Sequence, residues 1–277
     1  MNGSGGPGTK EKATQVRGLL LSCAFMLSAY GICAQTPSSR RASIEEILEL
    51  SQIESITSGI AESLMARVSA LAGDLSSEEQ THLRSAMSRG FIQDDLRSDI
   101  VEFMSVEADD DLVADVLEKL RTGATSKIRR IEDAYSPSQS LEEYVASVEV
   151  SMPSGERVNL IGRWAAARST GDFYIILAEA ERETAHEVLR ALRGDAPAFV
   201  ALSRAEYDRE HESQTRMAVL SLLYRFESVS DELLKEAIAE YESESGQWYI
   251  ETYTFGIAEA VWLAGQRVAH QLSEDIG

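Results

Sequence analysis

The stretch DELLKEAIAEYESESGQWYIETYTFGIAEAVWLAGQRVAHQL, residues 231–272, decides the fold of this 277-residue chain. We expect a helix over Asp231–Glu242, a break over Ser243–Gly246 and a longer helix over Gln247–Leu272. In the longer helix, residues that suit a core recur at steps of three and four: Tyr249, Tyr253, Ile257, Val261, Ala264, Val268 and Leu272. Such a stripe predicts that one side of this helix is buried.

Three further aromatic residues, Trp248, Phe255 and Trp262, recur at steps of seven on nearly the opposite face of the same predicted helix. Aromatic rows at helical spacing usually belong to a core, whereas exposed ones mark partner sites. Two interpretations therefore stay open. The row is either a second core face or an interaction face, a groove or a dimer contact, with neighbouring Glu and Gln side chains as its polar rim.

The rest of the chain also has helical periodicity, and no run of alternating residues with β-branched enrichment predicts a strand. Capping boxes predict helix starts at Ser43 with Glu46, at Ser76 with Glu79 and at Ser140 with Glu143. We expect the first of these helices to reach Gly73, with Gly59 as a point where it can bend or divide. The sequence therefore predicts an all-α, multi-helix bundle.

We expect two related helical halves in this bundle, because residues 112–128 can be laid on residues 233–249 at an offset of 121 without a gap. Both stretches contain a helix, a break and a second helix. The predicted organisation is a signal peptide over 1–34, a linker over 35–42, an N-terminal half over 43–135, a connecting segment with a short helix over 136–156, and a C-terminal half over 157–277.

The first 34 residues have the pattern of a signal peptide. Lys10, Lys12 and Arg17 give a basic start, and Gly18–Ala29 is an apolar run too short to span a bilayer. Cleavage is expected after Ala34. This pattern predicts export to the periplasm or outside the cell, with no integral membrane span after cleavage.

Both cysteines of the chain lie inside the predicted signal peptide, so the mature protein would have no disulfide, no thiol nucleophile and no cysteine metal ligand. The formal net charge is −20. A strongly acidic chain without a basic patch disfavours nucleic-acid binding and anionic lipid surfaces as partners. Solubility is the simplest explanation of the charge.

One possible metal site is suggested by Glu183 and His186, which have the E-x-x-H spacing of di-iron helical bundles. Asp208 and His211 repeat the spacing with Asp in place of Glu. However, Glu183 and His186 fall on the polar side of their helix, whereas ligands of such a site project into the bundle. No nucleophile motif accompanies them, so we nominate no catalytic residue and expect no cofactor.

The segment LLKEAIAEYESESGQ at Leu233–Gln247 resembles a motif of the exported bacterial DUF-2059 family. In that family a helix ends in an aromatic residue and is followed by Ser, Pro and Gly. Tyr241, Ser243, Gly246 and Gln247 match the motif, but Glu244 stands where Pro is usual. A looser copy of the same turn is LRTGATSKIRRIE at residues 120–132. The segment IEEILELSQIESI at residues 44–56 resembles the opening helix of the family. The resemblance implies an all-helical exported protein of unassigned activity and carries over no catalytic residue; Ser243 and Gly246 are expected to form a structural turn.

From these observations we expect a non-enzymatic binding or scaffolding module of the bacterial envelope. Its partner would be another envelope protein or a second copy of the chain. Two alternatives stay open: a metal-dependent enzyme that uses the His–carboxylate motifs, and a chaperone-like holder of apolar clients with an open groove between the halves.

Overall fold

The computed structural model describes residues 38–106, 108–134, 140, 143–146 and 153–276. All of its regular elements are helices, which confirms the predicted all-α, multi-helix bundle. The predicted signal peptide lies outside the described residues. Residues 39–277 form one compact unit, which contains both predicted halves. In the described part of the chain, no helix is both long enough and apolar enough to cross a bilayer.

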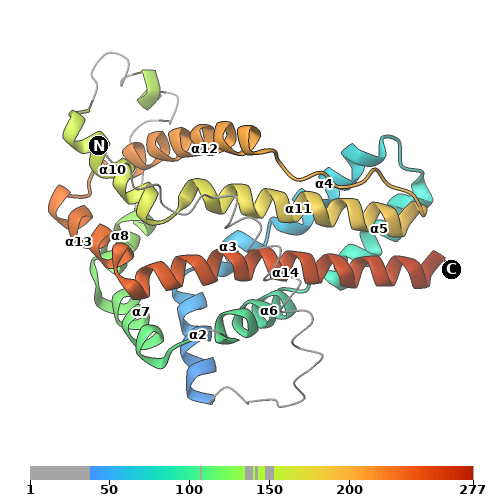
Figure 1. Cartoon of the computed structure of the whole chain (residues 1–277), viewed down its shortest axis with the longest axis horizontal. Coiled ribbons are helices and arrows are strands. Elements are labelled where there is room, and N and C mark those ends of the chain that lie inside the picture. The colour runs from blue at the N-terminus through green and yellow to red at the C-terminus, as the bar shows by residue number, and fades with distance from the viewer. Residues whose placement is uncertain (1–37, 107, 135–139, 141–142, 147–152, 277) are drawn as a thin grey trace, which may run out of the picture. The chain divides into compact units, whose positions relative to one another are not determined.

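The helices are placed in chain order and keep the labels of Figure 1. They are α2 Ser38–Leu50, α3 Ile53–Thr57, α4 Ile60–Ala72, α5 Ser77–Gly90, α6 Gln93–Val106, α7 Asp110–Thr122, α8 Ala124–Asp133, α10 Gly155–Ala167, α11 Thr170–Arg193, α12 Arg204–Arg225, α13 Asp231–Glu242 and α14 Glu244–Ile276.

The predicted N-terminal helix is wrong in two respects. It begins at Ser38, so Ser43 lies inside α2 and does not cap it. It also divides into three helices, with breaks at Ser51–Gln52 and at Ser58–Gly59. Gly59 was expected to be a weak point, but Gln52 was not: its φ of 55° places it in the left-handed region, which is uncommon for a residue with a side chain.

Two of the three predicted capping boxes are confirmed, those at Ser76 and at Ser140. Ser76 accepts a hydrogen bond from the backbone N–H of Glu79, whose side chain accepts one from the N–H of Ser76, so the predicted capping box is confirmed. The same reciprocal pair joins Ser140 and Glu143. These boxes satisfy backbone donors that a helix start leaves without partners.

The junction between α13 and α14 is a single residue, narrower than the predicted break over Ser243–Gly246. Ser243 has an extended backbone, and its hydroxyl donates to the carbonyl of Glu240 at 2.6 Å and accepts from the N–H of Gly246 at 3.2 Å. Gly246 already lies in α14. One serine therefore ends one helix and starts the next.

The α7–α8 and α13–α14 pairs meet through matching positions. The carboxylate of Glu240 in α13 accepts from the backbone N–H groups of Ala124 and Thr125 at 2.6 and 2.8 Å, in the first turn of α8. Lys119 in α7 donates to the hydroxyl of Ser245 at 2.7 Å, in the first turn of α14. Lys119 and Glu240 are 121 residues apart, as are Ala124 and Ser245. The two helix pairs therefore contact each other through residues that are related by the same offset of 121 positions.

Helix α14 is the element around which the others pack. It contacts α5, α6, α7, α11 and α13, and Figure 1 shows it alongside α11 with α6 on its other side. All seven residues of its predicted stripe, Tyr249 to Leu272, are buried. Two contacts show that α11 and α14 run in the same direction: Phe173 stacks on Tyr253 at 6.5 Å, and Thr184 lies against Gly265.

Candidate functional site

The aromatic row of α14 lies between the two predicted alternatives. Trp248, Phe255 and Trp262 are each half-buried. Trp248 packs against the main core, whereas Phe255 and Trp262 do not belong to it. Glu251 and Gln266 beside them are exposed. Trp248 is therefore part of the packed interior, whereas Phe255 and Trp262 form a partly open aromatic surface. We call Phe255 and Trp262 the α14 aromatic face.

Glu259 borders the α14 aromatic face, and its carboxyl has an altered affinity for protons. Burial raises the pKa of Glu259, and the nearby charge of Asp99 adds to the rise. Asp99 itself pairs with Arg267 at 2.9 Å, but burial raises its pKa as well. Asp99 therefore has a cationic partner in Arg267, whereas Glu259 is affected by the negative charge of Asp99.

We expect Glu259→Gln to raise the midpoint of thermal unfolding at pH 7. A carboxyl whose pKa is higher in the folded state than in the unfolded state destabilises the fold when ionised, and this penalty disappears as the pH falls through the folded-state pKa. The advantage of the variant over wild type should therefore shrink as the pH falls through the folded-state pKa, and it should be lost below the ordinary glutamate pKa of about 4.3. Calorimetry between pH 4 and 8 measures this difference.

Glu251→Gln is the matched control, because Glu251 is an exposed carboxylate on the same helix. It should leave the unfolding midpoint nearly unchanged at every pH, as isolated surface charges contribute little. Equal gains for both variants at pH 7 would mean that the net charge of the chain, and not the burial of Glu259, limits stability.

The four metal-ligand candidates are not brought together. Nδ1 of His186 lies 2.9 Å from the carbonyl oxygen of Pro197, and Glu183 is exposed. His211 lies beside Asp172, with 3.6 Å between Nε2 and Oδ1. Asp172 and His186 are fourteen residues apart on α11, about 21 Å along a helix. The E-x-x-H pair and the Asp208–His211 pair therefore occupy different levels of the bundle.

His211 instead joins a small polar cluster at the start of α11. Its ring stacks on Tyr207 at 6.2 Å, and the Tyr207 hydroxyl donates a hydrogen bond to Asp172. Asp208 pairs with Arg204 at 2.8 Å on the exposed side of α12. Across the described residues, no group of three or more His, Cys, Asp or Glu side chains is arranged to hold a metal ion.

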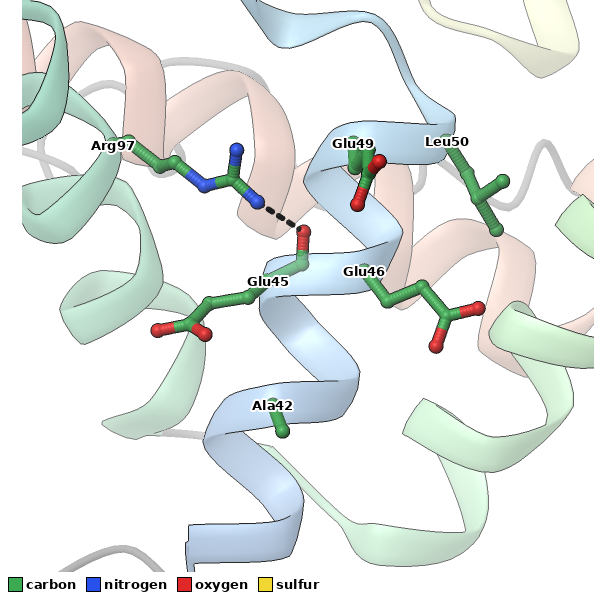
Figure 2. A pocket seen from close by; sticks show the side chains of 6 residues that line it. All are labelled: Ala42, Glu45, Glu46, Glu49, Leu50 and Arg97. Carbon is green, nitrogen blue, oxygen red and sulfur yellow. Dashed lines mark hydrogen bonds between the residues drawn. The ribbon is translucent and has the colours of Figure 1, made fainter.

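A shallow acidic hollow lies over α2, as Figure 2 shows. It measures about 370 Å³ and is lined by Ala42, Glu45, Glu46, Glu49, Leu50 and Arg97. Its cation, Arg97, donates to the backbone carbonyl of Glu45 at 2.9 Å. Glu46 binds Arg121 outside the hollow through two bonds of 2.6 and 2.5 Å. Because its charged groups are open to solvent and pair mainly with residues outside it, we assign no ligand to this hollow.

The sequence did not predict a second cluster, which we call the arginine–tyrosine cluster: Arg168, Tyr241, Tyr249 and Tyr253. Arg168 ends α10, and its guanidinium carbon lies 5.6 Å from the ring centre of Trp164 and 5.7 Å from that of Tyr241. Tyr249 and Tyr253, one turn apart on α14, have ring centres 5.4 Å apart. The cluster therefore combines one cation with three phenols from two helices.

Two backbone kinks adjoin the arginine–tyrosine cluster. In the described residues, Gln52 and Ser169 are the non-glycine residues with positive φ, at 55° and 45°. Ser169 follows Arg168 directly. Gln52 follows Ser51, whose hydroxyl lies 2.7 Å from that of Tyr249. Such conformations cost about 1–3 kcal/mol each and are concentrated at functional sites. The fold thus places both strained residues next to the same group of side chains.

Little in the sequence points to the arginine–tyrosine cluster. Its one signal is the spacing of Tyr241, Tyr249 and Tyr253, two of which were predicted only as part of the core stripe. Arg168 precedes the predicted break at Thr170–Gly171, where nothing distinguishes it from a surface arginine. Only the packing of the α10–α11 junction against α13 and α14 brings it to the phenols.

Comparison of the chain with protein-family models, with curated proteins and with solved structures found no match. The resemblance to the DUF-2059 family therefore stays a prediction from residues 233–247 and their looser copies. The function is argued below from the side chains of this chain alone.

Proposed function

We propose that this protein is an exported, non-enzymatic binding module of the bacterial envelope, and that the α14 aromatic face is its contact surface. The observation that carries the proposal is the half-exposure of Phe255 and Trp262 on the helix that organises the fold. Aromatic side chains flanked by a polar rim are typical of binding surfaces. The partner would be another envelope protein or a second copy of this chain.

Export is the part of this proposal that rests on the sequence alone, through the basic start and apolar run of residues 1–34. Expression in a bacterial host, followed by cell fractionation and N-terminal sequencing, tests it. The expected product begins at Gln35 in the periplasm or the medium. An intact chain that stays in the cytoplasm would contradict export without affecting the contact surface.

Trp262→Ala tests the contact surface. We expect a loss of stability smaller than the loss of about 3–5 kcal/mol for a fully buried tryptophan, because Trp262 is half-buried and lies outside the main core. Binding or self-association should weaken by tenfold or more, as truncation of an aromatic anchor costs at least about 1.4–2 kcal/mol. Sedimentation equilibrium measures self-association, and site-specific photo-crosslinking at position 255 in intact cells identifies a partner.

Tyr174→Ala is the matched control, since Tyr174 is an aromatic residue of α11 that is 49% exposed. It should change neither the crosslinked product nor the sedimentation profile. A monomeric wild type that gives no crosslink through position 255 would contradict the proposed contact surface.

A further inference from the structure

Arg168 carries a charge that no neighbour neutralises by direct contact. In the part of the chain that the structure describes, its guanidinium makes no hydrogen bond and no ion pair; its contacts are with the rings of Trp164 and Tyr241. The residue is half-buried. An arginine offers five N–H donors in a rigid fork. A half-buried arginine that uses none of them on the protein has donors available for a ligand.

Tyr253 is the second donor without a partner. It is 7% exposed, and its hydroxyl has no hydrogen bond in the structure. Phe173, five residues after Arg168 in the chain, stacks on the ring of Tyr253 at 6.5 Å and so places Tyr253 near the α10–α11 junction. Burial raises the pKa of Tyr253, whereas the charge of Arg168 lowers it. Since the net shift is upward, the phenol keeps its proton at neutral pH and can donate it. A buried polar group left unpaired costs about 1–3 kcal/mol and calls for an explanation.

The acceptors near this site are already engaged. Glu132, the carboxylate that acts on the charge of Arg168, pairs with Arg225 at 3.2 Å. Glu240 accepts from the backbone of α8. The hydroxyl of Tyr249 is bonded to that of Ser51. Donors therefore outnumber acceptors, and the missing component is an acceptor, preferably one with negative charge.

We propose that Arg168 and Tyr253 form a binding site for a compact oxyanion, such as a small carboxylate or inorganic phosphate. Its oxygens would accept hydrogen bonds from the guanidinium and from the phenol, and charge-assisted bonds of this kind are stronger than neutral ones. The partial burial of Arg168 strengthens the attraction, because screening by water is weaker there. The proposal does not rest on the α14 aromatic face.

Calorimetric titration of the purified protein tests this site, with sodium acetate and sodium phosphate as probes and sodium chloride at equal ionic strength as the reference. We expect one of the two oxyanions to bind above the chloride background and to raise the midpoint of thermal unfolding. A response to acetate identifies a carboxylate site, and a response to phosphate alone identifies a site for tetrahedral oxyanions. Absence of binding for both probes overturns the proposal.

Arg168→Gln and Arg163→Gln form the matched pair of variants. Arg163 lies in the last turns of α10, which Arg168 follows, and it pairs with Glu242 at 3.0 Å on the surface. Arg168→Gln should weaken oxyanion binding by about tenfold or more, because hydrogen bonds to a charged group are lost, whereas Arg163→Gln should bind like wild type. Equal affinity in the two variants overturns the proposal.

Tyr253→Phe keeps the test decisive if Arg168→Gln does not fold. It removes only a hydroxyl that has no partner in the protein, so the fold should be preserved. Weaker oxyanion binding by this variant supports the site. Wild-type affinity in Tyr253→Phe excludes Tyr253 as a ligand and overturns the two-residue site.

Discussion

Gly246→Ala should destabilise this protein by about 3 kcal/mol, at the upper end of what overpacking costs. A Cβ atom at Gly246 would lie 2.2 Å from the carbonyl oxygen of Glu240 and 2.7 Å from the Cα atom of Tyr241. Both are backbone atoms of α13, so no side-chain rotation can relieve the clash. The start of α14 would have to move away from the end of α13.

This movement would also affect polar contacts at the junction. The side chain of Gln247 donates to the carbonyl of Tyr241 at 2.7 Å, and the N–H of Gly246 donates to the Ser243 hydroxyl. The expected loss is measured as a lower midpoint of urea unfolding at an unchanged m-value, which reports stability separately from compactness.

Gly162→Ala is the control, and we expect it to raise the stability of the protein. Gly162 lies inside α10, and a Cβ atom there would meet nothing within 4 Å. Alanine should therefore stabilise this helix by up to about 1 kcal/mol through its higher helix propensity. If both glycine variants gained stability, the close approach of α13 and α14 at Gly246 would be excluded.

The contrast between these two glycines reflects what the sequence could predict. The serine–glycine break after Tyr241 was visible as a local pattern, and the stripe from Tyr249 to Leu272 was visible as a period. The stripe was confirmed, and the break was found at Ser243 alone, since local chemistry and periodicity fix the type of an element and its buried side better than its exact ends. That Gly246 touches the backbone of α13 is a matter of packing, which no local pattern contains.

The breaks in the predicted N-terminal helix could not be located from the local sequence. Apolar spacing from Ile44 to Leu71 fits one helix, and Gln52 is an ordinary helix former. The chain nevertheless leaves the helix there, where the Ser51 hydroxyl meets that of Tyr249, 198 residues away. A contact between residues so far apart in the sequence is not contained in local helix propensity. The neighbours of Arg168 in α13 and α14 are likewise distant in the sequence and could not be predicted locally.

Trp164→Ala should have the largest effect of all, a loss of about 3–5 kcal/mol. Trp164 is 1% exposed, and its ring meets Phe226 and Tyr241 edge-on at centre distances of 5.5 and 5.3 Å. Edge-to-face pairs add stabilisation beyond the buried area. Truncation would leave a cavity among these rings and would remove the surface on which Arg168 lies.

The size of this loss measures how much the aromatic packing around Trp164, next to the arginine–tyrosine cluster, contributes to the stability of the protein. The free energy of unfolding of a domain is only about 5–15 kcal/mol. Trp164→Ala would therefore unfold this protein if its stability lies at the low end of that range, and would lower its urea midpoint strongly if it lies at the high end. Trp262→Ala serves as the comparison, because it deletes the same side chain from the half-exposed aromatic face. Similar losses for the two variants would mean that Trp262 is as deeply packed as Trp164, and the proposed contact surface on α14 would then be a second core face.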